Sequence, residues 1–518
     1  MGLDFGTLSA RGAVLDTSDG SIAAQTEFAY PHGVSRENLY RAEDIPLALD
    51  RVMRDLTAMC DARAIRAVGV DATGYTMVCL SGDGVPLALT DPFRGREQAQ
   101  IKLWKRHAAQ AQAEEALNLA REREEPFLAR TGWQISSEWM LPKYLEMYDA
   151  DPEAFAAADL VLDLNEYLCF LLTGKILRSA GSAGYKCLRG EKGELPDAAY
   201  FDALRPGLAG AVRHVLRGTP LPPGGPGAPL LPEAAARWGL RADVTAAPGI
   251  LDGHTAPILL GAVKPGDAAL ILGTSNVLTV QMSRFLPLHN VCGVARDGIV
   301  PGLWGVDAGQ ACTGEMLAWY MENLLPLSVA EAARRAGTDA HALLSSRVKE
   351  PWRNPVTVLD WWNGSRNAPS DLTLRGSVHG LSLDTAPEDI YLAMLQGIVC
   401  SDREILESMR GEGVRVNRFF AAGGMSGKNP LLMQEYANIL HCPVSVGEIR
   451  EGPAAASALF AALSCGIVPS VEEAYRRMGA RRFRVFEPDA EHGAEYEALF
   501  RRVHAVRIRN GSNGHGGA

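Results

Sequence analysis

The chain has 518 residues, which is too many for one hydrophobic core, so two large domains are expected. Hydrophobic residues make up 47% and charged residues 22%, which is ordinary for a soluble globular protein. The formal net charge of −10 argues against nucleic acid or an anionic membrane as the main partner, so an anionic substrate such as ATP would need local donors and a cation.

The N-terminal half begins as an antiparallel meander of short strands. Apolar runs bounded by turn residues predict strands at residues 2–5, 11–16, 22–30, 64–71, 75–80 and 85–89. A helix interrupts them, because Ile45, Leu49 and Leu56 fall on one helical face. This order predicts a mixed sheet with helices on its faces.

The rest of the chain repeats this pattern after a helical middle. Residues 97–166 are predicted to be mainly helical, and residues 216–232, rich in proline and glycine, are predicted to be a surface loop. Strands are then expected at 268–272, 276–282, 302–306 and 418–422, with helices at 314–324 and 430–440. The restart predicts a second domain of the same kind, with the boundary near residues 253–257.

Targeting and redox features are sparse. Residues 453–468 are the most apolar run, but they are mostly alanine with two serines and a glycine, which predicts a packed internal helix and no membrane span. The nine cysteines form no C-x-x-C pair, which indicates reduced thiols in a cytoplasmic protein. The chain opens almost directly into a strand, so no signal peptide is expected. The tail after Arg509 is low in complexity and is predicted to be disordered.

Two Gly-Thr turns give the first indication of chemistry. Gly6-Thr7 follows the first strand, and Gly273-Thr274-Ser275 follows the first strand of the second half. Such a turn exposes backbone N–H groups and a hydroxyl with no side chain in the way, which suits a phosphate. Either turn alone would be an ordinary hairpin, but the pair predicts a nucleotide held between two similar domains.

Two carboxylates stand close to these turns in the sequence. Asp4 ends the first strand, and a carboxylate beside a phosphate is favourable when a divalent cation lies between them, so Asp4 is a candidate outer ligand of Mg²⁺. Asp252 lies in a segment of small residues just before the second half, where it is either a catalytic base or a helix N-cap. His254 is a candidate base or metal ligand, with a structural role as the alternative.

A third glycine segment follows the strand predicted at 418–422. Gly423 and Gly424 would let a planar base lie against the backbone, and Pro430 suits the start of the next helix. Many strand-glycine-helix turns bind nothing, so this segment alone is a weak indication.

Taken together, these segments resemble the FGGY family of carbohydrate kinases over nearly the whole chain. The resemblance rests on residues 4–11, 273–275 and 423–424, and on a long C-terminal signature at 376–396. It implies an α/β fold of two actin-like (ribonuclease H-like) domains, each a mixed β-sheet flanked by helices, with ATP and sugar in an interdomain cleft. The implied divisions are a sugar-side domain at 1–253, a nucleotide-side domain at 254–500, and a helix end with a disordered tail at 501–518.

Within the family, the chain is similar to the members that act on ribulose. The supporting segments are residues 71–77, 103–107, 136–139, 182–186, 308–310 and 360–364. The resemblance implies ATP-dependent phosphorylation of the terminal 5-hydroxyl of a ketopentose, with L-ribulose as the first candidate and Mg²⁺ as cofactor. D-ribulose, xylulose or a polyol stays open as substrate, as does a catalytically inactive sugar-binding regulator. No nucleic acid or membrane partner is implied, and a homodimer stays open.

The resemblance also assigns site residues. Asp252 matches the catalytic base and, with Asp4, would hold Mg²⁺ through water. The implied sugar-binding residues are Gly74, Glu138, Trp139, Lys186, Asp252 and Asp307. The implied ATP-binding residues are Gly6, Thr7, Ser9, Arg11, Gly273, Thr274, Ser275, Gly423, Gly424, Lys428 and Asn429. The alternatives are a surface position for Lys186 and Glu138 and a core position for Trp139.

Two departures from the family pattern stand out. Asp307 occupies a position where the ribulose-phosphorylating members usually carry glutamate. Its carboxylate reaches about one bond less far, so either a bridging water or a different polyol as substrate is expected. The chain also begins a few residues shorter than is usual, so the natural start is expected upstream of Met1 or the first strand is clipped.

Overall fold

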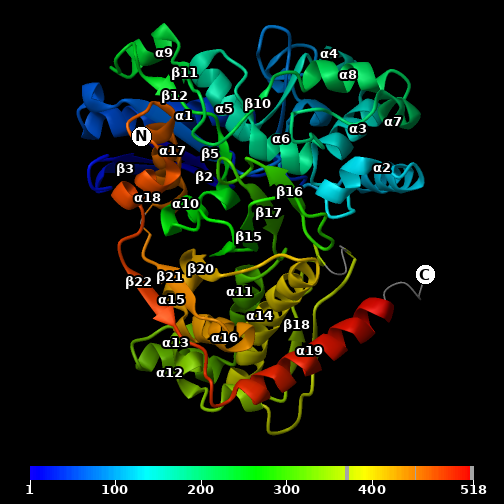
Figure 1. Cartoon of the computed structure of the whole chain (residues 1–518), viewed down its shortest axis with the longest axis vertical. Coiled ribbons are helices and arrows are strands. Elements are labelled where there is room, and N and C mark those ends of the chain that lie inside the picture. The colour runs from blue at the N-terminus through cyan, green and yellow to red at the C-terminus, as the bar shows by residue number, and fades with distance from the viewer. Residues whose placement is uncertain (368–370, 372, 450, 514–518) are drawn as a thin grey trace.

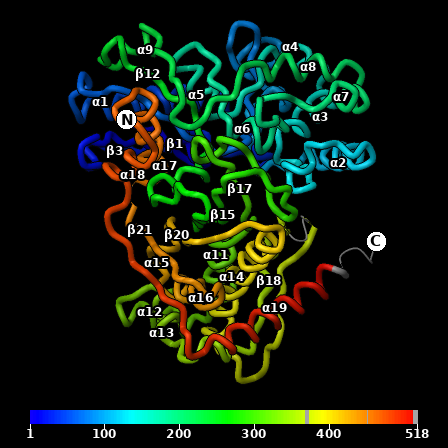
Figure 2. Tube along the Cα trace, in the orientation of Figure 1, coloured from blue at the N-terminus to red at the C-terminus, as the bar shows by residue number. Residues whose placement is uncertain are grey.

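The structure is a computed structural model that describes residues 1–367, 371, 373–449 and 451–513. Figure 1 shows two lobes, one above the other, and each is built around a seven-stranded sheet within these residues. We call them the N-terminal lobe and the C-terminal lobe. In the tube of Figure 2, the blue and cyan trace fills the upper lobe and the yellow trace fills the lower one.

The sheet of the N-terminal lobe has the strand order β11-β12-β5-β1-β2-β3, with β13 also paired to β5. Its strands are β1 (Gly2–Phe5), β2 (Ser9–Leu15), β3 (Ile22–Ala29), β5 (Ala67–Ala72), β11 (Ala228–Pro229), β12 (Thr245–Ala246) and β13 (Ile250–Leu251). A smaller sheet in the order β4-β7-β6-β8 joins β4 (Leu39–Tyr40), β6 (Met77–Leu80), β7 (Ile101–Lys102) and β8 (Leu160–Asp163).

The sheet of the C-terminal lobe has the order β16-β17-β15-β14-β20-β21-β22. Its strands are β14 (Asp267–Leu272), β15 (Asn276–Met282), β16 (Gly293–Arg296), β17 (Trp304–Ala308), β20 (Arg418–Ala422), β21 (Val444–Gly447) and β22 (Phe483–Phe486). Two short pairs lie outside the large sheets: β9 (Arg178–Ser179) with β10 (Pro220–Leu221), and β18 (Thr357–Leu359) with β19 (Ser377–His379).

The centres of the two large sheets are built alike. Strand β1 is antiparallel to β2 and parallel to β5, and β14 is antiparallel to β15 and parallel to β20. The turns β1–β2 and β14–β15 therefore occupy equivalent places in the two lobes. The prediction of a mixed sheet that restarts in the second half is confirmed.

Helices cover the faces of both sheets. The helices of the N-terminal lobe are α1 (Asp44–Met59), α2 (Gln110–Glu122), α3 (Met140–Ala150), α4 (Pro152–Ala157), α5 (Leu164–Thr173), α6 (Ala180–Lys186), α7 (Ala198–Leu204), α8 (Leu208–Val215) and α9 (Pro232–Arg237). The later helices are α10 (Ala256–Leu260), α11 (Gly314–Asn323), α12 (Leu327–Arg335), α13 (Ala340–Arg347), α14 (Pro387–Gly411), α15 (Gly424–Lys428), α16 (Pro430–Leu440), α17 (Gly452–Ser464), α18 (Val471–Met478) and α19 (Gly493–Asn513). The buried stripe of α1 contains the apolar residues whose spacing predicted it.

Helix α17 crosses from the C-terminal part of the chain to the N-terminal sheet. It packs on β1 and β5, and Figure 1 shows it in orange among the blue strands of the upper lobe. The approach is so close that a Cβ at Gly2 would lie 1.8 Å from the Ala454 carbonyl oxygen, and one at Gly69 would lie 1.9 Å from that of Ser457. The predicted packed internal helix is confirmed, and no helix of the described residues is long and apolar enough to cross a membrane.

Two expectations about local structure were wrong. Residues 85–89 do not form a strand: a single bridge joins Leu80 to Pro86, and residues Leu87–Leu89 are a 3₁₀ turn. Proline has no N–H to extend the ladder, and β6 finds its partners in β7 and β8. The predicted unstructured tail after Arg509 is helical to Asn513, where α19 ends, and residues 514–518 lie outside the described part.

The lobes meet along a contact that we call the seam, formed by residues 132–134 and 289–292. The Trp133 and His289 rings stack with centroids 3.8 Å apart, and the Gln134 side chain donates to the Val291 carbonyl at 2.6 Å. Nearby, β16 of the C-terminal sheet packs on α6, the helix that ends at Lys186. The seam therefore adjoins the elements that carry the predicted sugar-binding residues.

Candidate active site

The two Gly-Thr turns take the same form. The Gly6 N–H donates to the Ser9 carbonyl at 3.0 Å, and the Gly273 N–H donates to the Ser275 carbonyl at 3.0 Å. A Cβ at either glycine would meet only ordinary van der Waals contacts, at 3.5 Å and 3.7 Å. Packing of the chain therefore does not require glycine here, and the bare backbone leaves room in front of each turn for a ligand.

Three side chains in or just after β3, β4 and β7 fix the first turn. The Tyr30 hydroxyl donates to the Gly6 carbonyl at 3.1 Å, and the Tyr40 hydroxyl donates to the Thr7 carbonyl at 2.9 Å. The Trp104 indole N–H also donates to the Thr7 hydroxyl, at 3.4 Å. These donors occupy the carbonyl side of the turn and leave its N–H side to other partners.

The third glycine segment lies against the second turn. Gly423 has φ of 102°, and a Cβ there would lie 2.3 Å from the carbonyl oxygen of Leu272, the last residue before the turn. On the same side, the Gly314 N–H at the start of α11 donates to the Gly273 carbonyl at 3.1 Å. A Cβ at Gly424 would meet nothing within 4 Å, so this backbone is open to a ligand.

Four residues predicted to bind ATP have other partners or face solvent. Asn429 is buried and caps α16, accepting from the Leu432 N–H at 3.0 Å and donating to the Tyr391 hydroxyl at 2.8 Å. Lys428 is exposed. Ser9 and Arg11 both donate to Glu27 on β3, at 2.7 Å and 3.1 Å. The backbone of the three glycine segments is better placed for a nucleotide than these side chains.

Three carboxyl groups, those of the buried Asp4 and Asp71 and of the half-buried Asp252, gather beside the first turn. Asp4 on β1 and Asp71 on β5 are direct partners in the parallel ladder, and Asp252 follows β13, which also pairs with β5. Burial raises the pKa of Asp4, and burial together with the neighbouring charge of Asp4 raises the pKa of Asp71. The Ser457 hydroxyl of α17 donates to Asp71 at 2.6 Å, which fixes that carboxyl group.

Asp252 is held by backbone donors in this cluster. Its carboxyl group accepts from the Gly253 N–H at 2.7 Å and from the Gly74 N–H, and the N-cap of α10 is Thr255. The capping alternative for Asp252 is therefore wrong. Burial, with the charge of Asp4, raises the pKa of Asp252 to about 7. That value suits a group that gains and loses a proton near neutral pH.

Two buried ionisable side chains, Asp163 and Lys143, hydrogen-bond to the backbone of the turn after Asp71. Tyr75 adopts φ of 63°, and its N–H donates to the Asp163 carboxylate at 3.0 Å. Lys143 donates to the Tyr75 carbonyl at 2.7 Å, and burial lowers the pKa of this lysine to about 7. This support aims the Gly74 N–H at Asp252.

Lys186 and Asp307 face each other from opposite lobes. The Lys186 ammonium lies 3.8 Å from an Asp307 oxygen, 4.4 Å from the Tyr75 ring centroid and 5.0 Å from that of Trp139. Both charged side chains are buried, which rules out a solvated surface lysine. Burial opposes the charge on Asp307, but hydrogen bonding to His254 and the Lys186 charge keep its pKa below the usual range. Trp139 is buried and also contacts Lys186, which agrees with a core position, while its contact with the sugar stays a prediction.

Glu138 lies beside Trp139 and pairs with a cation of the other lobe. Its Oε1 accepts from the Arg366 guanidinium at 3.1 Å, and both side chains are largely buried. Glu138 is therefore not a surface acid. Burial opposes its charge, but Arg366 and other nearby cations hold the pKa of Glu138 below its usual range.

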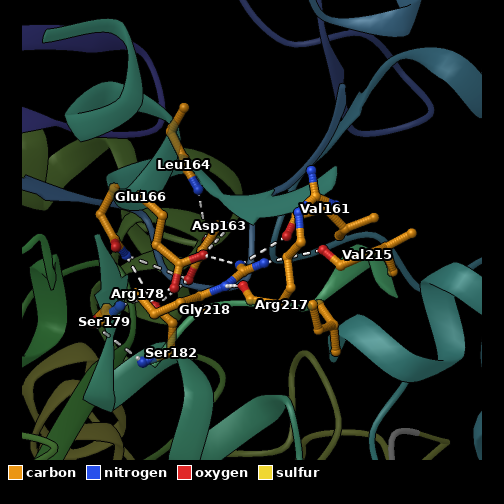
Figure 3. Close-up of polar contacts among 12 residues, drawn as sticks. Val161, Asp163, Leu164, Glu166, Arg178, Ser179, Ser182, Val215, Arg217 and Gly218 are labelled. Carbon is orange, nitrogen blue, oxygen red and sulfur yellow. Dashed lines mark hydrogen bonds and ion pairs between the residues drawn. The ribbon is translucent and has the colours of Figure 1, made fainter. Parts of the chain in front are cut away.

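A buried network sets the position of α6 and thus of Lys186. Figure 3 shows Arg178 paired with Glu166, while the Ser182 hydroxyl of α6 points to Asp163. The guanidinium lies 2.6 Å from Glu166, and the Ser182 hydroxyl donates to Asp163 at 2.7 Å. Asp163 therefore ties α6 to the Tyr75 turn, so Lys186 and Gly74 are positioned by one carboxylate.

Comparison with known proteins identifies the family to which this chain belongs. The model of the C-terminal domain of the FGGY family of carbohydrate kinases matches residues 268–465. A ribulokinase of Shouchella clausii is 33% identical, over 96% of this chain and 93% of its own. One of Mycolicibacterium smegmatis is 36% identical, over 96% of this chain and 92% of its own. This chain belongs to the FGGY family of carbohydrate kinases.

Solved structures show that the fold of this FGGY kinase is shared. A ligand-bound xylulose kinase of Lactobacillus acidophilus matches with a TM-score of 0.82 and 20% identity, over 98% of this chain and 97% of the other. A glycerol kinase of Plasmodium falciparum with ADP matches with a TM-score of 0.76 and 16% identity, over 97% of each chain. The predicted two-domain α/β fold class is confirmed. The boundaries at 253 and 500 stay a prediction, and α17 joins the N-terminal sheet from beyond the first of them.

Sequence reasoning missed two residues of this kinase's candidate site. Asp71 ends its strand just as Asp4 does, and parallel pairing of those two strand ends would have placed them together. Arg366 stands two residues after the segment 360–364 that supported the resemblance, but nothing in its local pattern points to a partner 228 residues away. His254, by contrast, was weighed as a base, and it lies buried with its Nε2 3.7 Å from Asp307.

Proposed function

We propose that this kinase transfers the γ-phosphoryl group of ATP to the 5-hydroxyl of a ketopentose, with L-ribulose as the first candidate. The observation that carries the proposal is Asp252, a half-buried carboxyl group beside the first Gly-Thr turn that accepts from the Gly253 N–H and has its pKa raised to about 7. The curated relatives that match over nearly the whole chain are named ribulokinases, which supports ribulose.

Asp252 would act as the general base. In its ionised form it accepts the proton of the sugar hydroxyl as that oxygen attacks the γ-phosphorus in line with the leaving ADP oxygen. The Gly253 and Gly74 N–H groups hold the carboxylate in place. Phosphoryl transfer depends chiefly on such positioning and on stabilising charge, so a fixed base is the contribution expected of this residue.

The backbone of the two turns would bind the phosphates. The N–H groups of Thr7, Thr274 and Ser275 would donate to the phosphate oxygens, where negative charge develops during transfer, while the Gly6 and Gly273 N–H groups close the two turns. The backbone at Gly423 and Gly424 would line the adenosine pocket. The exposed Lys428 and the helix-capping Asn429 are less favourably placed to bind ATP than this backbone.

The carboxyl cluster fits a divalent cation held through water. Asp71 Oδ1 is buried without a partner among the described residues, and Asp4 and Asp252 lie beside it. The described part of the chain contains no group of three or more His, Cys, Asp or Glu side chains that could hold a metal ion directly. This favours ligation of the cation through water. Mg²⁺ bound here would neutralise charge on the phosphate oxygens. Asp4 and Asp252 would hold it.

Lys186 and Asp307 would bind the sugar between the lobes. Lys186 can donate to the keto oxygen or a hydroxyl group, and Asp307 can accept from a hydroxyl group. The gap of 3.8 Å between them leaves donors of the ammonium free for the sugar. The shorter carboxylate of Asp307 is the feature that keeps D-ribulose, xylulose and polyols as competing substrates.

Two measurements test the proposal. ADP release with D- and L-ribulose, D- and L-xylulose, ribitol and glycerol should be greatest with a ribulose. Asp252→Asn should lower kcat about 10²- to 10⁴-fold, because the base is lost. Its ATP dissociation constant should stay within a few-fold of the wild-type value. Asp243→Asn, at an exposed surface pair, is the control and should change neither. Tight sugar binding without ADP release from any substrate would instead support the inactive regulator.

A further inference from the structure

The guanidinium of Arg366 has unused hydrogen-bonding capacity inside the candidate sugar site. Five N–H groups are available on arginine, and Nη2 donates to Glu138. Arg366 Nε is buried and has no partner among the described residues. A buried donor without an acceptor is unfavourable, so this N–H is placed for a ligand that the structure does not contain.

The surroundings of Arg366 form a polar pocket wall. Its guanidinium lies 5.2 Å from the Trp104 ring centroid, and that indole donates to Thr7 in the first turn. On the other side, the charge of Arg366 acts on both Glu138 and Asp307. The side chain therefore stands among groups of the N-terminal lobe while its backbone belongs to the C-terminal lobe.

A chain of contacts separates Arg366 from Asp252. Tyr75 directly follows Gly74, whose N–H acts on Asp252, and the Tyr75 ring centroid lies 4.4 Å from the Lys186 ammonium. The same ammonium lies 5.0 Å from the ring centroid of Trp139, which follows Glu138, the partner of Arg366. Lys186 also reaches Asp307 and the Tyr75 ring, so it lies between the two ends.

From this order we propose that Arg366 and Glu138 together bind the hydroxyl group of the sugar carbon farthest from the transferred phosphoryl group, and so determine substrate length. The inference rests on the proposed function, because the sugar must enter with its 5-hydroxyl at Asp252. The Arg366 Nε–H donates to the remote hydroxyl oxygen, and a Glu138 carboxylate oxygen accepts that hydroxyl's proton in a hydrogen bond. For a 2-ketopentose, the group so recognised is the C1 hydroxyl.

The test compares L-ribulose with 1-deoxy-L-ribulose, which lacks the C1 hydroxyl. The wild-type kinase should bind ribulose more tightly, because the deoxy analogue leaves the buried groups of Arg366 and Glu138 unpaired. Arg366→Gln should weaken ribulose binding about 10- to 100-fold, the size expected for a hydrogen bond to a charged group. It should bind the two sugars almost equally, with the KM for ATP changed less than about twofold.

Two further variants separate binding from folding. Arg366→Lys keeps the charge opposite Glu138 but lacks the Nε–H, so it should keep the wild-type melting temperature and still fail to discriminate between the sugars. A purely structural ion pair would instead be rescued by lysine. Arg353→Gln, at an exposed pair with Glu350 in the same lobe, is the matched control and should behave as wild type.

Sugar binding is measured by calorimetry without ATP, alongside steady-state kinetics. If Arg366→Gln and Arg366→Lys keep the wild-type preference for ribulose over the deoxy analogue, the inference is overturned while the proposed function stands. If the wild-type protein neither binds nor phosphorylates any pentulose, both fail. Loss of discrimination in both variants, with ATP binding unchanged, supports the inference.

Discussion

Asp252 owes its chemistry to what surrounds it more than to its own position in the sequence. Its carboxyl group is partly removed from water and lies near the charges of Asp4 and Asp163, and each of these favours its protonated form. The N–H groups of Gly253 and Gly74 oppose this by stabilising the carboxylate. The balance leaves the pKa of Asp252 at about 7, so both forms are accessible near neutral pH.

The first prediction concerns the pH dependence of the chemical step. A base must be ionised to accept a proton, and the raised pKa of Asp252 means that the carboxylate is lost as pH falls through about 7. We expect the single-turnover rate to be level above about pH 7.5 and to fall about tenfold per pH unit well below 7. Rapid quenching with saturating ATP and sugar measures it. A rate that is the same at about pH 5.5 and about pH 7.5 would contradict the role of Asp252.

Residues of the site differ in how far the sequence could reveal them. Asp252 and Lys186 were predicted through segments that resemble a family, since each stands within a local motif. Asp71 and Arg366 were missed, because their partners Asp4 and Glu138 are reached only through strand pairing and lobe contact. The spacing of residues within a short segment does not indicate which distant segments the fold brings into contact.

Elements were predicted best where turn residues and apolar alternation agree. The strand Asn276–Met282 was predicted to the residue, because the Gly-Thr turn fixes its start. The strand predicted at residues 85–89 was wrong, since Pro86 has no N–H to donate to a β-ladder. The helix α17 was predicted as internal, but its place on the N-terminal sheet was not, because alanine-rich faces fit many partners.

The second prediction tests the contact of α17 with the sheet. Gly69→Ala would place a Cβ 1.9 Å from the Ser457 carbonyl oxygen, a backbone atom that cannot rotate away. We expect the free energy of unfolding to fall by about 3 kcal/mol, at the upper end of overpacking costs. Ser457 also bonds to Asp71, so the carboxyl cluster should be disturbed and kcat should fall with stability. Urea denaturation and steady-state kinetics measure the two effects.

Gly210→Ala is the matched control for this element. Gly210 is exposed on α8, and a Cβ there would meet nothing within 4 Å. Alanine in a helix should raise stability by about 0.5–1 kcal/mol and leave kcat unchanged. Equal effects of the two substitutions would show that α17 does not pack on Gly69 in solution.

At the scale of the whole molecule, neither lobe holds a complete site. The first turn, Asp252 and Lys186 are joined to the N-terminal sheet, whereas the second turn and Asp307 belong to the C-terminal sheet. The distance between Lys186 and Asp307 is therefore set by how the lobes meet. Two contacts fix how the lobes meet: the seam, and beside it the packing of α6 on β16, the neighbour of the strand that carries Asp307.

The last prediction alters the seam without touching the site. Gly132 has φ of 63°, and a Cβ there would lie 2.0 Å from the Val291 carbonyl oxygen across the seam. Gly132→Ala should therefore force the lobes apart at this edge and raise the KM for the sugar several-fold, because Lys186 and Asp307 no longer face each other correctly. Gly207→Ala separates this effect from backbone strain: Gly207 has φ of 77°, but a Cβ there would meet nothing within 4 Å. Both substitutions should cost about 1–2 kcal/mol of stability for the left-handed backbone, and only the first should change the KM. Steady-state kinetics measures the KM, and chemical denaturation measures the stability. An unchanged KM for the sugar in Gly132→Ala would show that the seam does not affect sugar binding.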